Sequence, residues 1–468
     1  MLLENEIKQV CKAIANKESI KESKKNNLIN KFKRDWIRIM TLSQLYNKFS
    51  NTYSLNKLEF TDYGLKSNVY IVPPLTFDKL DSNREMIEEN LGCIIVFNHT
   101  RASKWITTKF IFNQNDTKEF EIIEEKSPYK IFIGNDYSGR AIFSDLRKYP
   151  HVLVSGTTRS GKSKMADCTI TNLIVNCSPK ELQLYLIQVA KNDLDIYSQV
   201  EHTRAFADTL EKTVTVLRYI KEVVMPERNA KIKPYHRKGM LDNAYEYNDL
   251  KKVGDVIPAT LICFDEMASL FQTKGNNKEE KKLKEQIAGY VESIAQYGSS
   301  LNIWLFSSIQ RPTIDNLPPF VKGMSNTLIS LKQANSKSSE VATDDSKRAL
   351  DLKQREFTYH LDNWDYGLVP MVNLKQIYKY IKPYIKPNHR TLFDDLEKLS
   401  HRNGVKKNKE SLVEVGSHIK TEKEILNESI SKIDNYVPYQ NYTGMNIINE
   451  TKLSIRTDRP INNGKEKI

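Results

Sequence analysis

The feature that most constrains this chain is the segment GTTRSGKS, which occupies residues 156–163. A short apolar run, HVLVS, precedes it, and the segment KMADCTITNLIVNC follows it. The apolar side chains between Ala166 and Cys177 recur at helical spacing, so the second segment is typical of an amphipathic helix. A strand, a glycine-rich turn and a helix in this order predict one βα unit.

The turn itself satisfies the spacing G-x-x-x-x-G-K-[ST] in full. In such a unit the backbone N–H groups of the loop and the positive end of the helix point at an anion. We therefore expect a loop that binds the phosphates of a nucleotide, although a glycine turn without a ligand is the simpler alternative. The expected binding residues are Gly156, Thr157, Thr158, Arg159, Ser160, Gly161, Lys162 and Ser163.

Two of these residues have further expected roles. Lys162 is expected to reach the β- and γ-phosphates and to act in catalysis, and the Ser163 hydroxyl is expected to ligate Mg²⁺. A second residue expected to bind the metal, Asp265, follows the apolar run ATLICF, and its carboxylate would hold Mg²⁺ through the water molecules around the ion. Glu266, the next residue, is placed to polarise the water that attacks the γ-phosphate.

An acid pair after an apolar strand also arises as a helix cap, but a phosphate loop upstream favours the catalytic interpretation.

A third apolar run, NIWLFSS, ends close to Gln310. Because the carboxyl ends of parallel strands line the ligand crevice, Gln310 is a candidate catalytic residue that senses the γ-phosphate or positions the water. A surface loop is the alternative interpretation.

Changes of pattern along the chain predict four regions. Residues 1–57 form a basic helical module, and residues 58–127 form a small α+β domain. Residues 128–375 alternate strands with long helices, which is typical of an α/β fold with a parallel-rich sheet. Residues 376–468 form a polar segment rich in Lys and Asn that we expect to be partly disordered.

The formal net charge of +13 favours an anionic partner, either nucleic acid or the acidic face of a membrane, although a solvated lysine-rich surface is an equal alternative. No apolar run approaches the roughly 18 residues of a membrane span, and the N-terminus lacks the pattern of a signal peptide. We therefore expect a cytoplasmic protein. The five cysteines are scattered and form no CxxC pair, which argues against a zinc site.

Several ordered segments between about Lys130 and Leu331 resemble the FtsK/SpoIIIE family of DNA-pumping ATPases. They are IFIGNDYSGRAIFSDLRKYPHVLVSGTTRSGKS, YLIQVAKNDLDIY, MPERNAKI, DNAYEYN, LICFDEMASL and SIAQYGSSLNIWLFSSIQRPTIDNLP. This resemblance implies a RecA-like P-loop motor that uses ATP and Mg²⁺. It also implies a hexameric ring around double-stranded DNA, gripped without sequence preference.

The segment YGLKSNVYIVPPLTFDKLDSNREMIEENLGCIIVF is similar to the domain before the motor in FtsK-type coupling proteins of Gram-positive conjugative elements. This second resemblance implies that the chain pumps DNA during conjugative transfer, with relaxase and membrane-channel proteins as partners. Because the chain shows no membrane span of its own, a partner would recruit it to the membrane. An ATP-gated assembly scaffold and a secretion-type ATPase with little DNA pumping are the alternatives.

The chain also departs from the family pattern. Arg159 stands where the loop usually has glycine, and Gln188 stands where an acidic residue is usual. The arginine that a neighbouring subunit would supply to the site is left open among Arg311, Arg348 and Arg355. The basic segments KIKPYHRKGM and FQTKGNNKEEKK are candidate DNA-facing loops or solvated surface.

Overall fold

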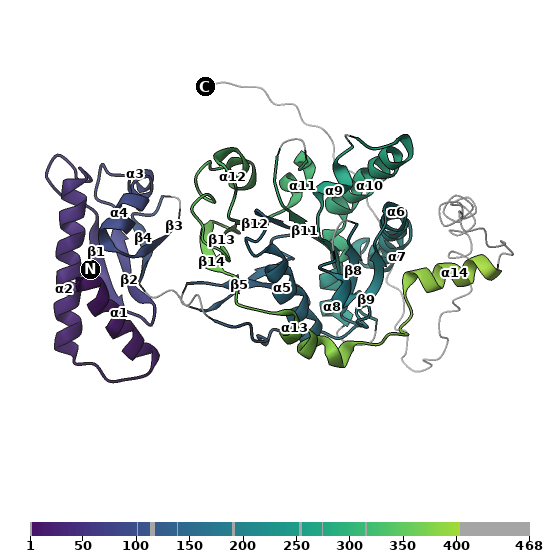
Figure 1. Ribbon diagram of the computed structural model, residues 1–468, viewed down its shortest axis with the longest axis horizontal. Coiled ribbons are helices and arrows are strands. Elements are labelled where there is room, and N and C mark those ends of the chain that lie inside the picture. Colours follow the sequence, from purple (N-terminus) through teal and green to yellow (C-terminus); the bar gives the residue numbers. More distant parts are fainter. Residues whose placement is uncertain are drawn as a thin grey trace, which may run out of the picture. The chain divides into compact units, whose positions relative to one another are not determined.

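The computed structural model describes residues 2–402, except 101, 113–117, 138, 190–191, 252–254, 274 and 314–315. Most of the segment expected to be polar and partly disordered, from residue 403 onward, lies outside the described residues. Figure 1 shows the order of the helices and strands along the chain.

A four-stranded antiparallel sheet with four helices forms the N-terminal part of the chain, and its strand order is β1-β2-β4-β3. The strands are β1 (Ser54–Phe60), β2 (Gly64–Tyr70), β3 (Ile94–His99) and β4 (Trp105–Ile111). The helices are α1 (Leu2–Ala15), α2 (Glu22–Leu42), α3 (Phe77–Asp81) and α4 (Arg84–Leu91).

One hydrophobic core joins the helices of this part to its sheet. The face of α2 that includes Phe32 and Trp36 is buried, and the Phe32 ring meets Phe110 of β4 edge-on with centroids 4.9 Å apart. Trp36 also donates its indole N–H to the carbonyl oxygen of Tyr53, at 2.7 Å. The two regions that we expected as separate, residues 1–57 and 58–127, therefore share this core.

A ten-stranded mixed sheet forms the second part, in the order β6-β5-β14-β13-β12-β7-β11-β10-β8-β9. Its strands are β5 (Lys130–Asn135), β6 (Ala141–Asp145), β7 (Val152–Ser155), β8 (Leu182–Ile187), β9 (Thr203–Ala207), β10 (Ala259–Phe264), β11 (Ile303–Ile309), β12 (Thr327–Leu331), β13 (Glu356–His360) and β14 (Trp364–Leu368). The strands from β12 to β9 in this order pair in parallel, and the remaining pairs are antiparallel. The expected α/β fold with a parallel-rich sheet is confirmed.

Helices cover both faces of this sheet. The helices of this part are α5 (Lys162–Asn176), α6 (Leu210–Tyr219), α7 (Met225–His236), α8 (Ala244–Lys251), α9 (Ala268–Phe271), α10 (Lys278–Tyr297), α11 (Pro319–Met324), α12 (Ser336–Thr343), α13 (Leu374–Ile381) and α14 (Leu392–Arg402). A π-helical turn, Ile220–Val224, joins α6 to α7, and 3₁₀ turns lie at Asp195–Tyr197, Ser299–Leu301 and Lys382–Tyr384.

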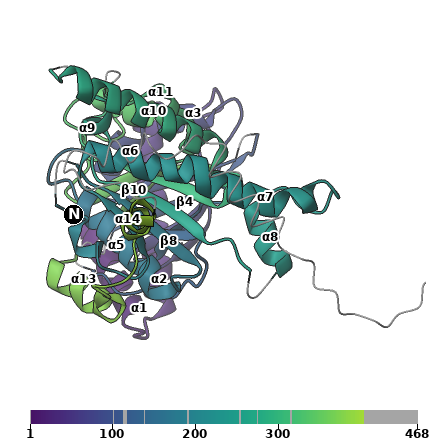
Figure 2. The ribbon, with the colours of Figure 1, turned by 90° about the vertical axis from the view of Figure 1, so that its right-hand side faces the viewer.

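Alternating side chains divide each central strand between two cores. In β10, Leu261 and Cys263 pack with α5 and α13, whereas Ile262 and Phe264 pack with α6 and α10. Figure 2 shows these two pairs of helices on opposite sides of the strands. Both faces are covered, so the strand is buried at all six positions, which explains its unbroken apolar sequence.

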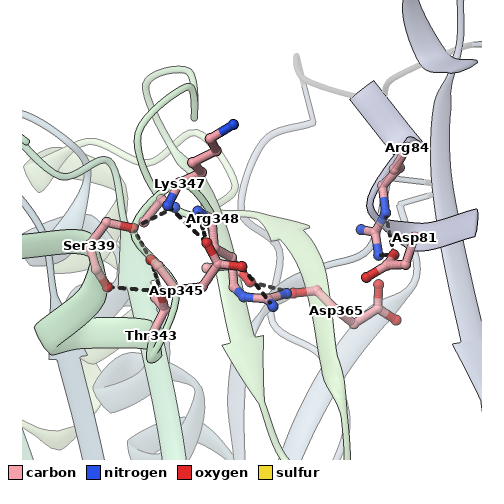
Figure 3. A network of polar contacts seen from close by, with 10 residues as sticks. Asp81, Arg84, Ser339, Thr343, Asp345, Lys347, Arg348 and Asp365 are labelled. Carbon is pink, nitrogen blue, oxygen red and sulfur yellow. Dashed lines mark hydrogen bonds and ion pairs between the residues drawn. The ribbon is translucent and has the colours of Figure 1, made fainter. Parts of the chain in front are cut away.

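A ring contact connects the N-terminal part to strand β14. Figure 3 shows the ion pairs of the two arginines that lie near this strand, Arg84 with Asp81 and Arg348 with Asp345. Arg84 of α4 pairs with Asp81, and its guanidinium lies over the ring of Tyr366 at 5.9 Å from the centroid. Arg348 pairs with Asp345 at 3.2 Å, and its guanidinium lies over the Trp364 ring of β14 at 5.0 Å. Two arginines therefore stack on aromatic rings of strand β14.

A buried arginine joins α7 to the central strands. Arg228 donates Nη1 to the carbonyl oxygens of Leu301 and Asn302, at 2.8 and 3.0 Å. Its Nη2 donates to the Thr260 hydroxyl at 2.6 Å. Burial lowers the pKa of Arg228 to about 10, so the guanidinium remains protonated at neutral pH. These bonds anchor α7 to the amino-terminal ends of β10 and β11.

We expect Arg228→Met to lower the free energy of unfolding by roughly 2 kcal/mol, because a buried polar group left without its partner costs about 1–3 kcal/mol. Urea denaturation followed by circular dichroism measures the change. Lys233→Met, at an exposed position of the same helix, is the matched control and should leave the unfolding midpoint unchanged. Equal midpoints for the two variants would contradict the anchoring role.

Candidate nucleotide-binding site

The glycine-rich loop lies between the end of β7 and the start of α5, as its sequence predicts. Gly156 has φ 151° and Gly161 has φ 119°, a region of backbone conformation that favours glycine. A Cβ at Gly156 would lie 2.8 Å from Ser160 Oγ and 2.9 Å from Leu331 Cβ. Both the backbone angle and the close neighbour therefore require glycine at residue 156.

Neighbouring strands hold this loop from behind. The Gly156 N–H donates to the carbonyl oxygen of Ile309 at the end of β11, at 3.2 Å. The Thr157 N–H donates to Lys332, directly after β12, at 2.9 Å. The Arg355 N–H, directly before β13, donates to the Ser160 carbonyl oxygen at 2.8 Å. Three segments distant in sequence thus determine the path of the loop.

Lys162 opens α5 and turns back into the loop. Its side chain is buried, and its ammonium donates to the carbonyl oxygen of Gly156 and, at 3.1 Å, to that of Thr157. The positive charge therefore lies inside the curve of the loop, where the backbone N–H groups of a helix start would also face an anion.

The other predicted residues come to the same edge of the sheet. Asp265 follows β10 directly, and its N–H donates to the carbonyl oxygen of Ile187 in β8 at 3.1 Å. The carboxylate of Glu266 accepts a hydrogen bond from the Gln310 backbone N–H at 3.3 Å. The Thr158 hydroxyl in turn donates to the Gln310 side-chain oxygen at 3.4 Å. Gln310 thus connects the phosphate loop to Glu266.

A cavity beside the loop is lined by Ser163, Asp265, Ser308 and two aspartates that the sequence motifs do not single out, Asp167 and Asp193. The Ser163 hydroxyl donates to Asp193 Oδ2 at 2.6 Å. Burial raises the pKa of Asp167, and the nearby carboxylate of Asp193 adds to this rise. Asp193 follows β8, the neighbour of β10, so a search of every strand's carboxyl end would have found it.

These residues fit an ATP molecule with its Mg²⁺. Magnesium is held in such sites by one or two protein oxygens together with substrate phosphates, and the cavity offers a hydroxyl and carboxylates. In the part of the chain that the structure describes, no cluster of three or more His, Cys, Asp or Glu forms a metal cage. A metal held mainly by ATP phosphates needs no such cage.

The departures from the family pattern have structural correlates. Arg159 has φ 62°, a left-handed conformation that costs a non-glycine residue about 1 kcal/mol, which explains why glycine suits this position. Three arginines are candidates for the one that a neighbouring subunit would supply. Of these, Arg348 is stacked on Trp364, and Arg355 is half-buried behind the phosphate loop. Arg311 is exposed.

Comparisons with known proteins agree with this geometry. Residues 115–355, about half of the chain, match the FtsK/SpoIIIE family. The chain belongs to this family. It is 30% identical over 223 residues to the DNA translocase FtsK of Campylobacter jejuni, which covers 47% of this chain and 22% of that protein. It is 28% identical over 232 residues to the DNA translocase SftA of Bacillus subtilis, covering 49% and 22%.

A solved structure of the pCW3 conjugation coupling protein TcpA, in monomer form with ATPγS, has the same fold. It aligns with a TM-score of 0.51 and 19% identity, covering 75% of this chain and 99% of TcpA. The chain spans only about a fifth of the length of the FtsK and SftA relatives. Among the described residues, no helix is both long enough and apolar enough to cross a membrane.

We expect Gly156→Ala to abolish ATP binding while the fold persists, because the added Cβ meets Leu331 and strains the loop. Isothermal titration with ATPγS and Mg²⁺ measures the binding. Gly289→Ala is the control, since Gly289 lies inside α10 with no heavy atom within 4 Å of an added Cβ. That variant should bind normally and be slightly more stable, because alanine is the better helix former by about 1 kcal/mol. Normal ATP binding by the Gly156 variant would contradict the requirement for glycine at this position.

Proposed function

We propose that the chain is an ATP-dependent DNA translocase that hydrolyses ATP at this site and moves double-stranded DNA. The observation that carries the proposal is the meeting of the phosphate loop, Asp265, Glu266 and Gln310 at one edge of a parallel sheet. These contacts come from strands far apart in sequence, within a chain of the FtsK/SpoIIIE family. The relatives named as DNA translocases support the choice of DNA as the moved molecule.

Each side chain has a defined role in this mechanism. Bound Mg²⁺ would neutralise charge on the triphosphate and align its terminal phosphate. Lys162 stabilises the β- and γ-phosphate oxygens, and Ser163 with Asp265 holds the metal and its water shell. Glu266 accepts a proton from the attacking water. Gln310 is hydrogen-bonded to both Thr158 and Glu266, and it thereby fixes the position of the catalytic base relative to the phosphate loop.

Two basic segments are candidates for contact with DNA phosphates, and their charges differ. The end of α7 exposes Lys233, Arg237 and Lys238. At the start of α10, by contrast, exposed lysines alternate with Glu279, Glu280 and Glu285, so the local charge is close to balanced. We therefore assign the stronger DNA contact to the end of α7, since an unbalanced cationic patch attracts phosphates.

This function requires a ring whose subunit interface places a cation at the neighbour's γ-phosphate. Arg311 is the candidate for that role, because it is exposed and directly follows Gln310 after the end of β11. We infer a hexamer, by resemblance to the family. We also infer a cytoplasmic coupling role in conjugative transfer, with a relaxase and a membrane channel as partners.

We expect Glu266→Gln to bind ATP normally but to lose DNA-stimulated hydrolysis by at least about 100-fold, since a positioned general base contributes roughly 10²–10⁴-fold. Steady-state phosphate release with and without duplex DNA measures this. Glu279→Gln, an exposed glutamate, is the control and should hydrolyse at the original rate. Hydrolysis by the unmodified chain that duplex DNA does not stimulate would favour the assembly scaffold instead.

We expect Arg237→Ala with Lys238→Ala to weaken DNA binding at all sequences alike. The slope of log affinity against log salt should become shallower by roughly 2, because each lost phosphate contact removes about 0.9 from it. Fluorescence anisotropy on an unrelated pair of duplexes measures both quantities. Lys281→Ala with Lys282→Ala is the matched control, and a larger change in that variant would move the DNA contact to α10.

A further inference from the structure

The hydroxyl of Ser163 can donate one hydrogen bond, and the structure assigns its direction. Ser163 Oγ donates to Asp193 Oδ2 at 2.6 Å, within the usual range of an O–H···O hydrogen bond. Asp265, the carboxylate expected to accompany the metal, lines the same cavity. The acceptor of the Ser163 proton is nevertheless Asp193, which comes from the segment after β8 rather than after β10.

The direction of this proton matters for metal binding. A serine hydroxyl has one proton and two lone pairs, and only a lone pair can ligate Mg²⁺. A carboxylate that holds the proton on one side leaves a lone pair free to face the metal on the other. Groups behind a metal ligand orient it in this way, and their loss typically lowers metal affinity about 10–100-fold.

The segment that carries Asp193 is fixed in place by buried neighbours. The next residue, Leu194, is buried, and its N–H donates to the side-chain oxygen of Gln188 at 2.5 Å. Tyr197, in the 3₁₀ turn that follows, is also buried and donates its hydroxyl to Asp167 Oδ1 at 3.1 Å. Gln188, which stands where the family usually has an acid, thus serves here as an acceptor that shapes the Asp193 segment.

We propose that Asp193 is a positioning residue, which holds the Ser163 hydroxyl proton and so turns an oxygen lone pair toward the Mg²⁺ that accompanies ATP. The inference rests on the proposed function only in requiring that the site binds ATP with magnesium. It does not depend on DNA translocation. It gives the two carboxylates different roles, because Asp193 orients the protein ligand whereas Asp265 faces the metal's water shell.

The test compares the affinity for ATPγS in Mg²⁺ with that in EDTA, measured by isothermal titration on the full chain. Asp193→Ala should lower the affinity about 10–100-fold in Mg²⁺ and leave the EDTA value unchanged, because only metal coordination needs the oriented hydroxyl. Asp193→Asn should retain most of the affinity, since the amide oxygen can accept the same proton. Asp195→Ala is the control, because Asp195 is exposed two residues further along, and it should match the unmodified chain.

A double variant provides the decisive measurement. If Asp193 acts through Ser163, adding Asp193→Ala to Ser163→Ala should cause no further loss of affinity in Mg²⁺. A full additional loss would mean that Asp193 contacts the metal or nucleotide by itself, and an equal loss in EDTA would mean that it supports the loop generally. Either outcome overturns the proposal, as does unchanged affinity in Asp193→Ala.

The two proposals fail in different ways. Failure of the unmodified chain to bind ATPγS in Mg²⁺ would remove the proposed function and this inference together. Binding that depends on Asp193 without any stimulation of hydrolysis by duplex DNA would remove the translocase function and leave the role of Asp193 intact. Circular dichroism of each variant shows whether a lost affinity reflects a lost fold.

Discussion

The site depends on the close approach of the phosphate loop to the end of β12 and to the residue just before β13. Leu331 lies so near Gly156 that a single added carbon would meet it, and the Arg355 backbone donates to the loop at Ser160. The N–H groups of Gly156 and Thr157 donate outward to neighbouring backbone, and these bonds fix the curve of the loop around the Lys162 ammonium. The anion site is therefore a product of the sheet as much as of the loop.

The sheet can hold the loop in place because helices cover both of its faces. Alternate residues of β10 enter two separate cores, one beneath α5 and α13 and one beneath α6 and α10. Covered strands hold their register, and register sets which residues meet at the carboxyl edge. Phe264 pairs with Ser307, so Asp265 and Glu266 emerge level with the end of β11, where Gln310 follows.

Hydrogen bonds hold the two residues, Arg159 and Gln188, at which the sequence departs from the expected family pattern. Arg159 occupies a left-handed conformation in a loop whose family pattern has glycine, and the Gln354 side chain donates to its carbonyl oxygen at 3.3 Å. Gln188 lacks an acid's charge but keeps an acceptor oxygen that bonds Leu194. At both positions, the residue that departs from the family pattern still accepts a hydrogen bond, and this bond holds its segment in place.

Local residue patterns were enough to predict the phosphate loop, the α/β class and the polar side chains at the strand ends, because each follows from spacing or from a strand that ends in polar residues. Strand order, the division into two cores and the bond between Ser163 and Asp193 follow from packing in three dimensions. Asp193 is 30 residues from Ser163, and the segment after β8 reaches the start of α5 although β11 and β10 lie between β7 and β8 in the sheet. Local patterns carry no information on which strands become neighbours, since that choice depends on packing across the whole domain.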